Sequence, residues 1–576
     1  MGLDKWMAHV DQGIAGLFGQ WDLYSTGLVT LLIGIVSYKL YTRRDPDIHP
    51  FLLARQAQGS PVRQQGESPV YRSQAAPHGT PLNSGLNVKD PGAPKWAHGR
   101  HGDLRDIWRQ AVEGVKEEGP SKGTTGRLVT VLGTENVTEH KPEDVSRQIN
   151  LIGQHILDQG GDRVAIYLPN SVELIAALFA CAFYNLTAII LPFDQTEDAL
   201  ISMLRSSAAD TVIAAPGTFP FDSLVKSYSS LRVLIWVVDE GSKHMDWNEV
   251  PQGMGGSVNV STWQEVVNEQ LGTNATSLPP VEGQKEPRDV MLAWQSKSGD
   301  MEMVRFTAAN IIAGVAGQVL AIPTSERMGP DDLFLPADSL ANTHTLVLTL
   351  AAFYSNASIA VNSAAAQAAN LTIATAGITP TIVAATPAAL LQTHQEARQS
   401  SSSFLARQVH AMQTRTLTQA GVMPEASWFS SLVGGVRPIA GAQPGKLRLV
   451  YAAERAGAGT PPLSSALLSD LRVYLGARVV YALAAAKVAG AVAQTSFYDY
   501  RVDKTSHFGA PLTCAEVLLR DSGVYKTTDH EIKGEIVVRG PCVADGEAAL
   551  GVIGCIRQDN TLALSNAGNT VLSRDN

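Results

Sequence analysis

The hydrophobic positions of this chain alternate between short apolar runs and longer segments with helical spacing. DRVAIYLPN (162–170) has the pattern of a buried strand, SVELIAALFACAFYN (171–185) that of an apolar helix, and TAIILPF (187–193) that of another strand. PEDVSRQINLIGQHILDQG (142–160) has the spacing of an amphipathic helix with an acidic first turn. The alternation predicts a large α/β core with two mostly parallel sheets over residues 101–506.

The pattern changes after residue 506 to short strand-like runs separated by turn residues, such as EVLLRD (516–521) and GEIVVRG (534–540). Runs of this kind predict an antiparallel β subdomain over residues 507–576. Residues 45–100 are rich in Pro, Gly and Gln, which favours an irregular extended arm.

An almost uninterrupted apolar run, LYSTGLVTLLIGIVSYKLY (23–41), follows a short N-terminal flank, residues 1–22. As a helix this run is about 28 Å long, close to the roughly 30 Å of a bilayer's hydrocarbon core. Arg43 and Arg44 follow it, whereas acidic residues precede it, so the main domain is expected in the cytosol. The run predicts a single-pass anchor in the lipid bilayer, in the endoplasmic reticulum or the mitochondrial outer membrane. A buried helix of a soluble domain is the alternative.

Charge and cysteine usage exclude other classes. The net charge of −9 argues against a nucleic-acid partner, which requires a basic surface. The four cysteines form no CxxC pair and no ligand spacing with histidine, so neither a disulfide framework nor a zinc site is indicated.

Four segments, in order, resemble the adenylate-forming, AMP-binding superfamily, and specifically its long-chain fatty acyl-CoA synthetase branch. The segments are GDRVAIYLPNSVELIAALFACAFYNLTAIILPF (161–193), TPTIVAATPAALL (379–391), FGAPLTCAEVLLRD (508–521) and KGEIVVRGPCVADG (533–546). The resemblance implies the fold of that family's large N-terminal domain. It also implies a ligase that activates a fatty acid with ATP and passes it to coenzyme A.

The phosphate loop of that family corresponds to LAWQSKSGDMEMVRFTAANI (292–311). Ser296, Ser298 and Gly299 retain the small and hydroxyl residues that a phosphate-binding turn requires. Glu302 stands where the resemblance implies a lysine, so a carboxylate faces the expected triphosphate. Trp294 and Gln295 also replace small residues.

The second motif of the family, Tyr-Gly-x-Thr-Glu, corresponds to RVVYALAAAKVAG (478–490). Tyr481 is retained, whereas Ala482, Ala484 and Ala485 replace the glycine, the threonine and the glutamate. Mg²⁺ requires oxygen ligands, and an alanine side chain has none.

Two further positions depart from the family. Val552 replaces the aspartate that the resemblance implies for the ribose hydroxyls, and Ser339 stands at the position of a histidine near the acyl and AMP groups. The sequence also ends about where the resemblance implies a hinge and a mobile C-terminal domain that carries the catalytic lysine.

These residues predict a membrane-anchored pseudoenzyme, a binding or scaffold protein of lipid metabolism. It has no catalytic residues, no metal ligands and no expected cofactor. Its nucleotide site would be vestigial (Ser296, Ser298, Gly299 and Tyr481). Its expected partners are the bilayer through residues 23–41, a fatty acyl ligand and a protein. The alternative is a divergent ATP-dependent long-chain fatty acid–CoA ligase, which would use Mg·ATP and coenzyme A.

Overall fold

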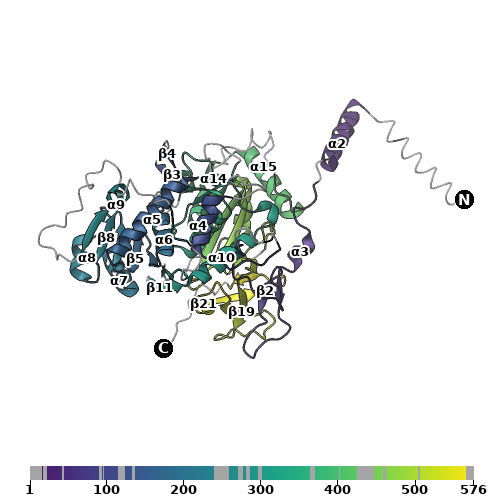
Figure 1. The fold of residues 1–576 in the computed structure, drawn as a ribbon. Coiled ribbons are helices and arrows are strands. Elements are labelled where there is room, and N and C mark those ends of the chain that lie inside the picture. Colours follow the sequence, from purple (N-terminus) through teal and green to yellow (C-terminus); the bar gives the residue numbers. More distant parts are fainter. Residues whose placement is uncertain are drawn as a thin grey trace.

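The fold is taken from a computed structural model. It describes residues 16, 22–41, 44–89, 94, 96–114, 124–132, 136–238, 258–269, 277–280, 286–295, 301–362, 370–400, 403–424, 446–457, 462–503 and 506–565. The described residues form three sheets with helices packed against them (Figure 1), so the predicted α/β architecture is confirmed.

The first sheet has seven strands in the order β11-β10-β6-β5-β7-β8-β9. All neighbours are parallel except β10 and β11, which form an antiparallel pair. The bounds are β5 (Arg163–Tyr167), β6 (Thr187–Ile190), β7 (Thr211–Ala214), β8 (Val233–Trp236), β9 (Asn259–Thr262), β10 (Val290–Gln295) and β11 (Met301–Phe306).

The second sheet has nine strands in the order β18-β17-β16-β15-β14-β12-β13-β3-β4. The strands from β16 to β3 in this order are parallel, and both edges are antiparallel. The bounds are β3 (Leu128–Leu132), β4 (Asn136–His140), β12 (Leu333–Pro336), β13 (Ser358–Val361), β14 (Ile382–Ala385), β15 (Leu449–Arg455), β16 (Arg478–Ala484), β17 (Ala493–Gln494) and β18 (Ala510–Pro511).

Helices α5 (Pro142–Asp158) and α6 (Val172–Phe183) lie between these two sheets (Figure 1), and α4 (Leu104–Glu113) contacts both helices. Eleven of the twelve α6 residues are buried, which explains why this helix is apolar all round. The other helices are α3 (Pro50–Ala54), α7 (Glu197–Ser207), α8 (Phe221–Ser227), α9 (Trp263–Glu269), α10 (Ala308–Leu320), α11 (Thr343–Tyr354), α13 (Leu371–Ala374), α14 (Pro387–Ser400), α15 (Phe404–Arg415) and α17 (Ser465–Leu475).

The third sheet is antiparallel and combines strands from the N-terminal and the C-terminal parts of the chain (Figure 1). β1 and β2, from the N-terminal segment, precede β19 to β22 in the strand order β1-β2-β19-β20-β21-β22. The expectation of an irregular arm over residues 45–100 is therefore corrected, because Tyr71 pairs with Val517 in the sheet. The bounds are β1 (Ala57–Gly59), β2 (Tyr71–Ser73), β19 (Glu516–Arg520), β20 (Lys533–Arg539), β21 (Glu547–Ile556) and β22 (Leu562–Leu564).

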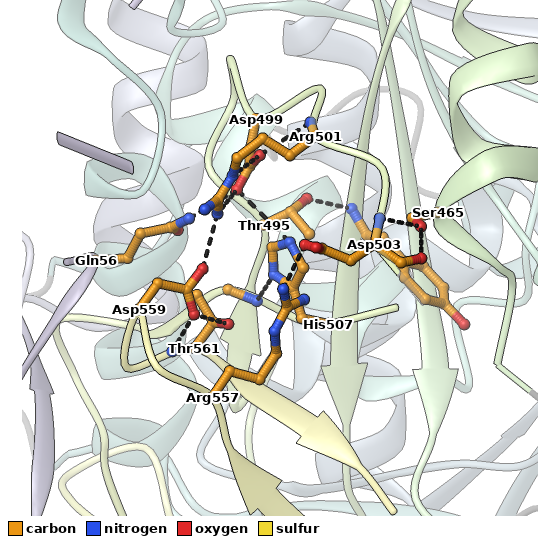
Figure 2. A network of polar contacts seen from close by, with 12 residues as sticks. Gln56, Ser465, Thr495, Asp499, Arg501, Asp503, His507, Arg557, Asp559 and Thr561 are labelled. Atoms are coloured by element: carbon orange, nitrogen blue, oxygen red, sulfur yellow. Dashed lines mark hydrogen bonds and ion pairs between the residues drawn. The ribbon is translucent and has the colours of Figure 1, made fainter. Parts of the chain in front are cut away.

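A buried polar network holds this N-terminal segment against the core (Figure 2). The Asp499 carboxylate accepts hydrogen bonds from Gln56 Nε2 at 2.7 Å and from Arg501 Nη2 at 2.6 Å. Arg501 also pairs with Asp559 at 2.9 Å, and His507 Nε2 lies 3.6 Å from Asp499. Burial acts to raise the pKa of Asp499, but the Arg501 hydrogen bonds and the nearby positive charges outweigh it and lower the pKa to about 2.

Helix α2 (Leu23–Tyr41) has the predicted bounds and stands apart from the sheets (Figure 1). Within the described part of the chain, no helix combines the length and the apolar character that a membrane crossing requires. The single-pass anchor over residues 23–41 stays a prediction. Hydroxyl residues interrupt the apolar run of α2, and Thr26 and Thr30 hydrogen-bond to backbone carbonyls of the preceding turn.

Candidate functional site

A pocket of about 440 Å³ opens at the carboxyl ends of four neighbouring parallel strands, β12, β14, β15 and β16. Asp338 follows β12, Thr386 follows β14, Arg455 ends β15 and Ala484 ends β16. Ligands of open α/β sheets bind at this edge, where the loops after the strands diverge. The position of the pocket therefore follows from the strand order.

Asp338 is a half-buried residue in the wall of this pocket. Its oxygens accept hydrogen bonds from the Ser339 N–H at 2.7 Å, from Asn342 Nδ2 at 2.8 Å and from Thr345 Oγ1 at 2.9 Å. Burial nevertheless raises the pKa of Asp338, and the charge of Arg455 only partly opposes this. The pocket therefore favours the protonated form of Asp338 more than water does.

Arg455 provides the positive charge of the pocket. Its guanidinium lies over the Trp294 ring, 4.3 Å from the ring centroid, a cation–π contact. Its Nε has no hydrogen-bond partner among the described residues. Burial lowers the pKa of Arg455, and Asp338 partly restores it. Trp294, which lies in the segment that resembles the family's phosphate loop, thus serves as a platform for an arginine.

Tyr481, the retained tyrosine of the second motif, lies in the core behind the pocket and is 0% exposed. Its hydroxyl donates to Glu454 Oε2 at 2.8 Å and accepts from the Leu463 N–H at 3.0 Å, while its ring lies against Phe508. Burial and the Glu454 charge raise the pKa of Tyr481 well above its usual value. Its described contacts are with protein groups, so its role in a nucleotide site stays a prediction.

The antiparallel pair β10–β11 carries the two ends of the segment that resembles the family's phosphate loop, and Trp294 is opposite Glu302 in its register. Ser296, Ser298 and Gly299 lie outside the described residues, so their predicted role is untested. The Glu302 carboxylate lies 3.8 Å from Lys487 Nζ, and both side chains are about half exposed. Lys487 thus brings a positive charge to this hairpin from just beyond the second motif.

The remaining substituted positions offer no side-chain oxygen to a ligand, or offer one already in use. Ala485 and Val552 are each 1% exposed, and Ala484 lines the pocket. Ser339 Oγ accepts a hydrogen bond from the Ala341 N–H at 3.2 Å. The part of the chain that is described contains no group of three or more His, Cys, Asp or Glu residues suited to a metal ion. These donors do not fit Mg·ATP in the way the resemblance implies.

The sequence analysis named none of the polar side chains that line the pocket, among them Asp338, His344, Glu454 and Arg455. Burial lowers the pKa of His344 to about 4, and its Nε2 has no hydrogen-bond partner among the described residues. The signal for Glu454 and Arg455 was available, since two charged residues directly follow the apolar strand run LVYAA (449–453). His344 begins an apolar helix and gives no comparable signal.

The fold is that of a large α/β domain with a pocket at its strand ends, and comparison with known proteins identifies its class. A model of the AMP-binding enzyme family matches residues 143–546. The chain belongs to the AMP-binding enzyme family. It is 22% identical over 407 residues to long chain acyl-CoA synthetase 8 of Arabidopsis thaliana, covering 67% of this chain and 54% of that protein. The chain thus spans about half the length of this curated relative.

Solved structures show the same fold at low sequence identity. A long-chain-fatty-acid-CoA ligase from Archaeoglobus fulgidus matches with a TM-score of 0.56 at 15% identity, over 84% of this chain and 86% of that chain. The anthranilate CoA ligase AuaEII in complex with anthranoyl-AMP matches with a TM-score of 0.56 at 16% identity. The match covers 81% of this chain and 78% of that chain. The predicted adenylate-forming fold is therefore confirmed.

Proposed function

We propose that this chain is an acyl-CoA-synthetase-like binding protein whose pocket holds an apolar carboxylate, such as a fatty acid, without adenylating it. The observation that carries the proposal is the stack of Arg455 on Trp294 in a pocket with Pro387, Leu391 and Leu463 in its walls. The surface of the pocket is mostly apolar although Asp338 and Glu454 also line it, and Arg455 is its one arginine. Such a pocket matches a ligand with one carboxylate and a hydrocarbon body.

Loss of nucleotide chemistry is the second part of the proposal. The residues at the magnesium and ribose positions are Ala485 and Val552, which have no side-chain oxygen. The carboxylates that do lie in the pocket already have partners, because Asp338 accepts from three donors and Glu454 accepts from Tyr481. The bilayer, a protein partner and a membrane location remain predictions.

The divergent ligase is a second candidate, and one contact favours it. Lys487 lies 3.8 Å from Glu302, so a positive charge does reach the hairpin that carries the phosphate loop. The pair is half exposed, however, and solvent-screened ion pairs of this kind contribute little. Mg·ATP and coenzyme A are the cofactors only under this alternative.

Calorimetric titration of the full chain with oleate and, separately, with Mg·ATP distinguishes the two functions. We expect oleate to bind and Arg455→Gln to weaken it about tenfold or more, the loss of one charge-assisted contact. Arg127→Gln is the matched control, because Arg127 is 70% exposed and lies outside the pocket. Release of pyrophosphate from ATP in the presence of oleate, suppressed by Lys487→Gln, would establish the ligase instead.

A further inference from the structure

A second cavity, of about 720 Å³, lies between helices α14, α15 and α17 and shares no lining residue with the pocket at the strand ends. Its lining residues lie at helical spacings of three or four positions, so each helix presents one face to it. They include Gln395 and Arg398 on α14, Arg407 and His410 on α15, and Asp470 and Tyr474 on α17.

Two arginines give this cavity its charge. The guanidinium groups of Arg398 and Arg407 have no ion-pair or hydrogen-bond partner among the described residues, and both residues are exposed. Burial and Asp470 raise the pKa of Tyr474, while the charges of both arginines oppose that rise. Both positive charges therefore act on the same phenol, although they come from different helices.

The one carboxylate among the lining residues, that of Asp470, lies near two imidazoles. His394 Nε2 lies 3.4 Å from one oxygen of Asp470, and His410 Nε2 lies 3.7 Å from the other. The His410 ring also stacks on Tyr474, with centroids 4.3 Å apart and an interplanar angle of 23°. Asp470 thus has a hydrogen-bond partner in His394. The two guanidinium groups have none among the described residues.

We propose that this cavity binds a phosphomonoester, with its phosphate between Arg398 and Arg407 and its organic body against the stacked rings of His410 and Tyr474. A phosphate dianion matches two positive charges, and the planar guanidinium fork matches phosphate oxygens. The cavity is much larger than a phosphate group, so the ligand carries an organic body. The whole chain has a net charge of −9, so general attraction of anions does not account for such binding.

Calorimetric titration of the full chain with phenyl phosphate tests this site. We expect Arg407→Gln to weaken binding about tenfold or more, because it removes one of two charge-assisted contacts. Arg415→Gln is the matched control, since Arg415 is exposed on the same helix but does not line the cavity. Thermal unfolding of each variant verifies that the fold is retained.

Titration with inorganic phosphate and with vesicles of phosphatidate in phosphatidylcholine identifies the source of the phosphate. Vesicle binding that is lost in Arg407→Gln and kept in Arg415→Gln supports the site with a lipid headgroup as its ligand. Binding of phenyl phosphate without binding to the vesicles supports the site with a soluble phosphomonoester as its ligand. The absence of binding to any probe at millimolar concentration, or equal weakening in both variants, overturns the proposal. Oleate binding at the strand-end pocket is expected to be unchanged in either variant.

Discussion

Replacement of Asp499 by asparagine tests whether the polar network stabilises the fold. The lowering of the Asp499 pKa from 3.8 to about 2 is equivalent to about 2.5 kcal/mol, at roughly 1.36 kcal/mol for each pH unit. The Asp499 side chain is 1% exposed, so solvent screening reduces this figure little. Asp499→Asn retains the shape of the side chain and removes its charge. We expect a loss of about 2–3 kcal/mol in the free energy of unfolding at pH 7.

The effect of Asp499→Asn should also depend on pH, in a direction that follows from the lowered pKa. The pKa of Asp499 is lower in the folded state than in the unfolded state, so its contribution is fully present above about pH 4. The contribution is lost as the pH falls through about 2. The difference between wild type and variant should therefore shrink in acid.

Urea unfolding followed by circular dichroism at pH 7 and at about pH 2 measures both effects. Asp331→Asn is the control, because Asp331 is exposed and has no ion-pair partner among the described residues. A loss below about 1 kcal/mol at pH 7, or a difference that is unchanged in acid, would refute the assignment of this stability to Asp499.

Three more predictions concern packing and protonation. Gly314→Ala should lower the free energy of unfolding in urea by about 2 kcal/mol, because its Cβ would lie 2.4 Å from the Ala489 carbonyl oxygen. Gly329→Ala is the control, since a Cβ there meets open space. The free energy of unfolding of the wild type should fall between about pH 6.5 and pH 4, because in that range the unfolded state binds more protons at His344 than the folded state does. His344→Gln should flatten this fall in urea unfolding measured across the range. A pH profile equal to that of the wild type contradicts the prediction. Cys181 should resist iodoacetamide at pH 8 until the protein unfolds, because burial raises the pKa of its thiol to about 12.

The elements with strong periodicity were predictable from the sequence. The run DRVAIYLPN became β5 and the following apolar segment became α6, because both lie between layers that bury them on every side. Thr307 and Asn310 form a capping box at the start of α10, a pairing that their spacing of three residues allows.

Contacts between distant segments were not predictable in the same way. Nothing in the local pattern of residues 71–73 shows that this strand pairs with residues 516–517. The pairing of a strand depends on its packing against neighbours that are distant in the sequence. The 3.8 Å approach of Lys487 to Glu302 likewise depends on how β16 and the β10–β11 hairpin are placed.

The pairing of β2 with β19 has a consequence for biosynthesis. Tyr71 leaves the ribosome long before Val517, its partner in the sheet, is made. β1 and β2 can pair with each other early, but β2 has no β19 beside it until most of the polypeptide has been translated, since domains otherwise fold as soon as their own residues emerge. During that interval their open edges are a natural substrate for a chaperone, and this sheet should be the last of the three to assemble.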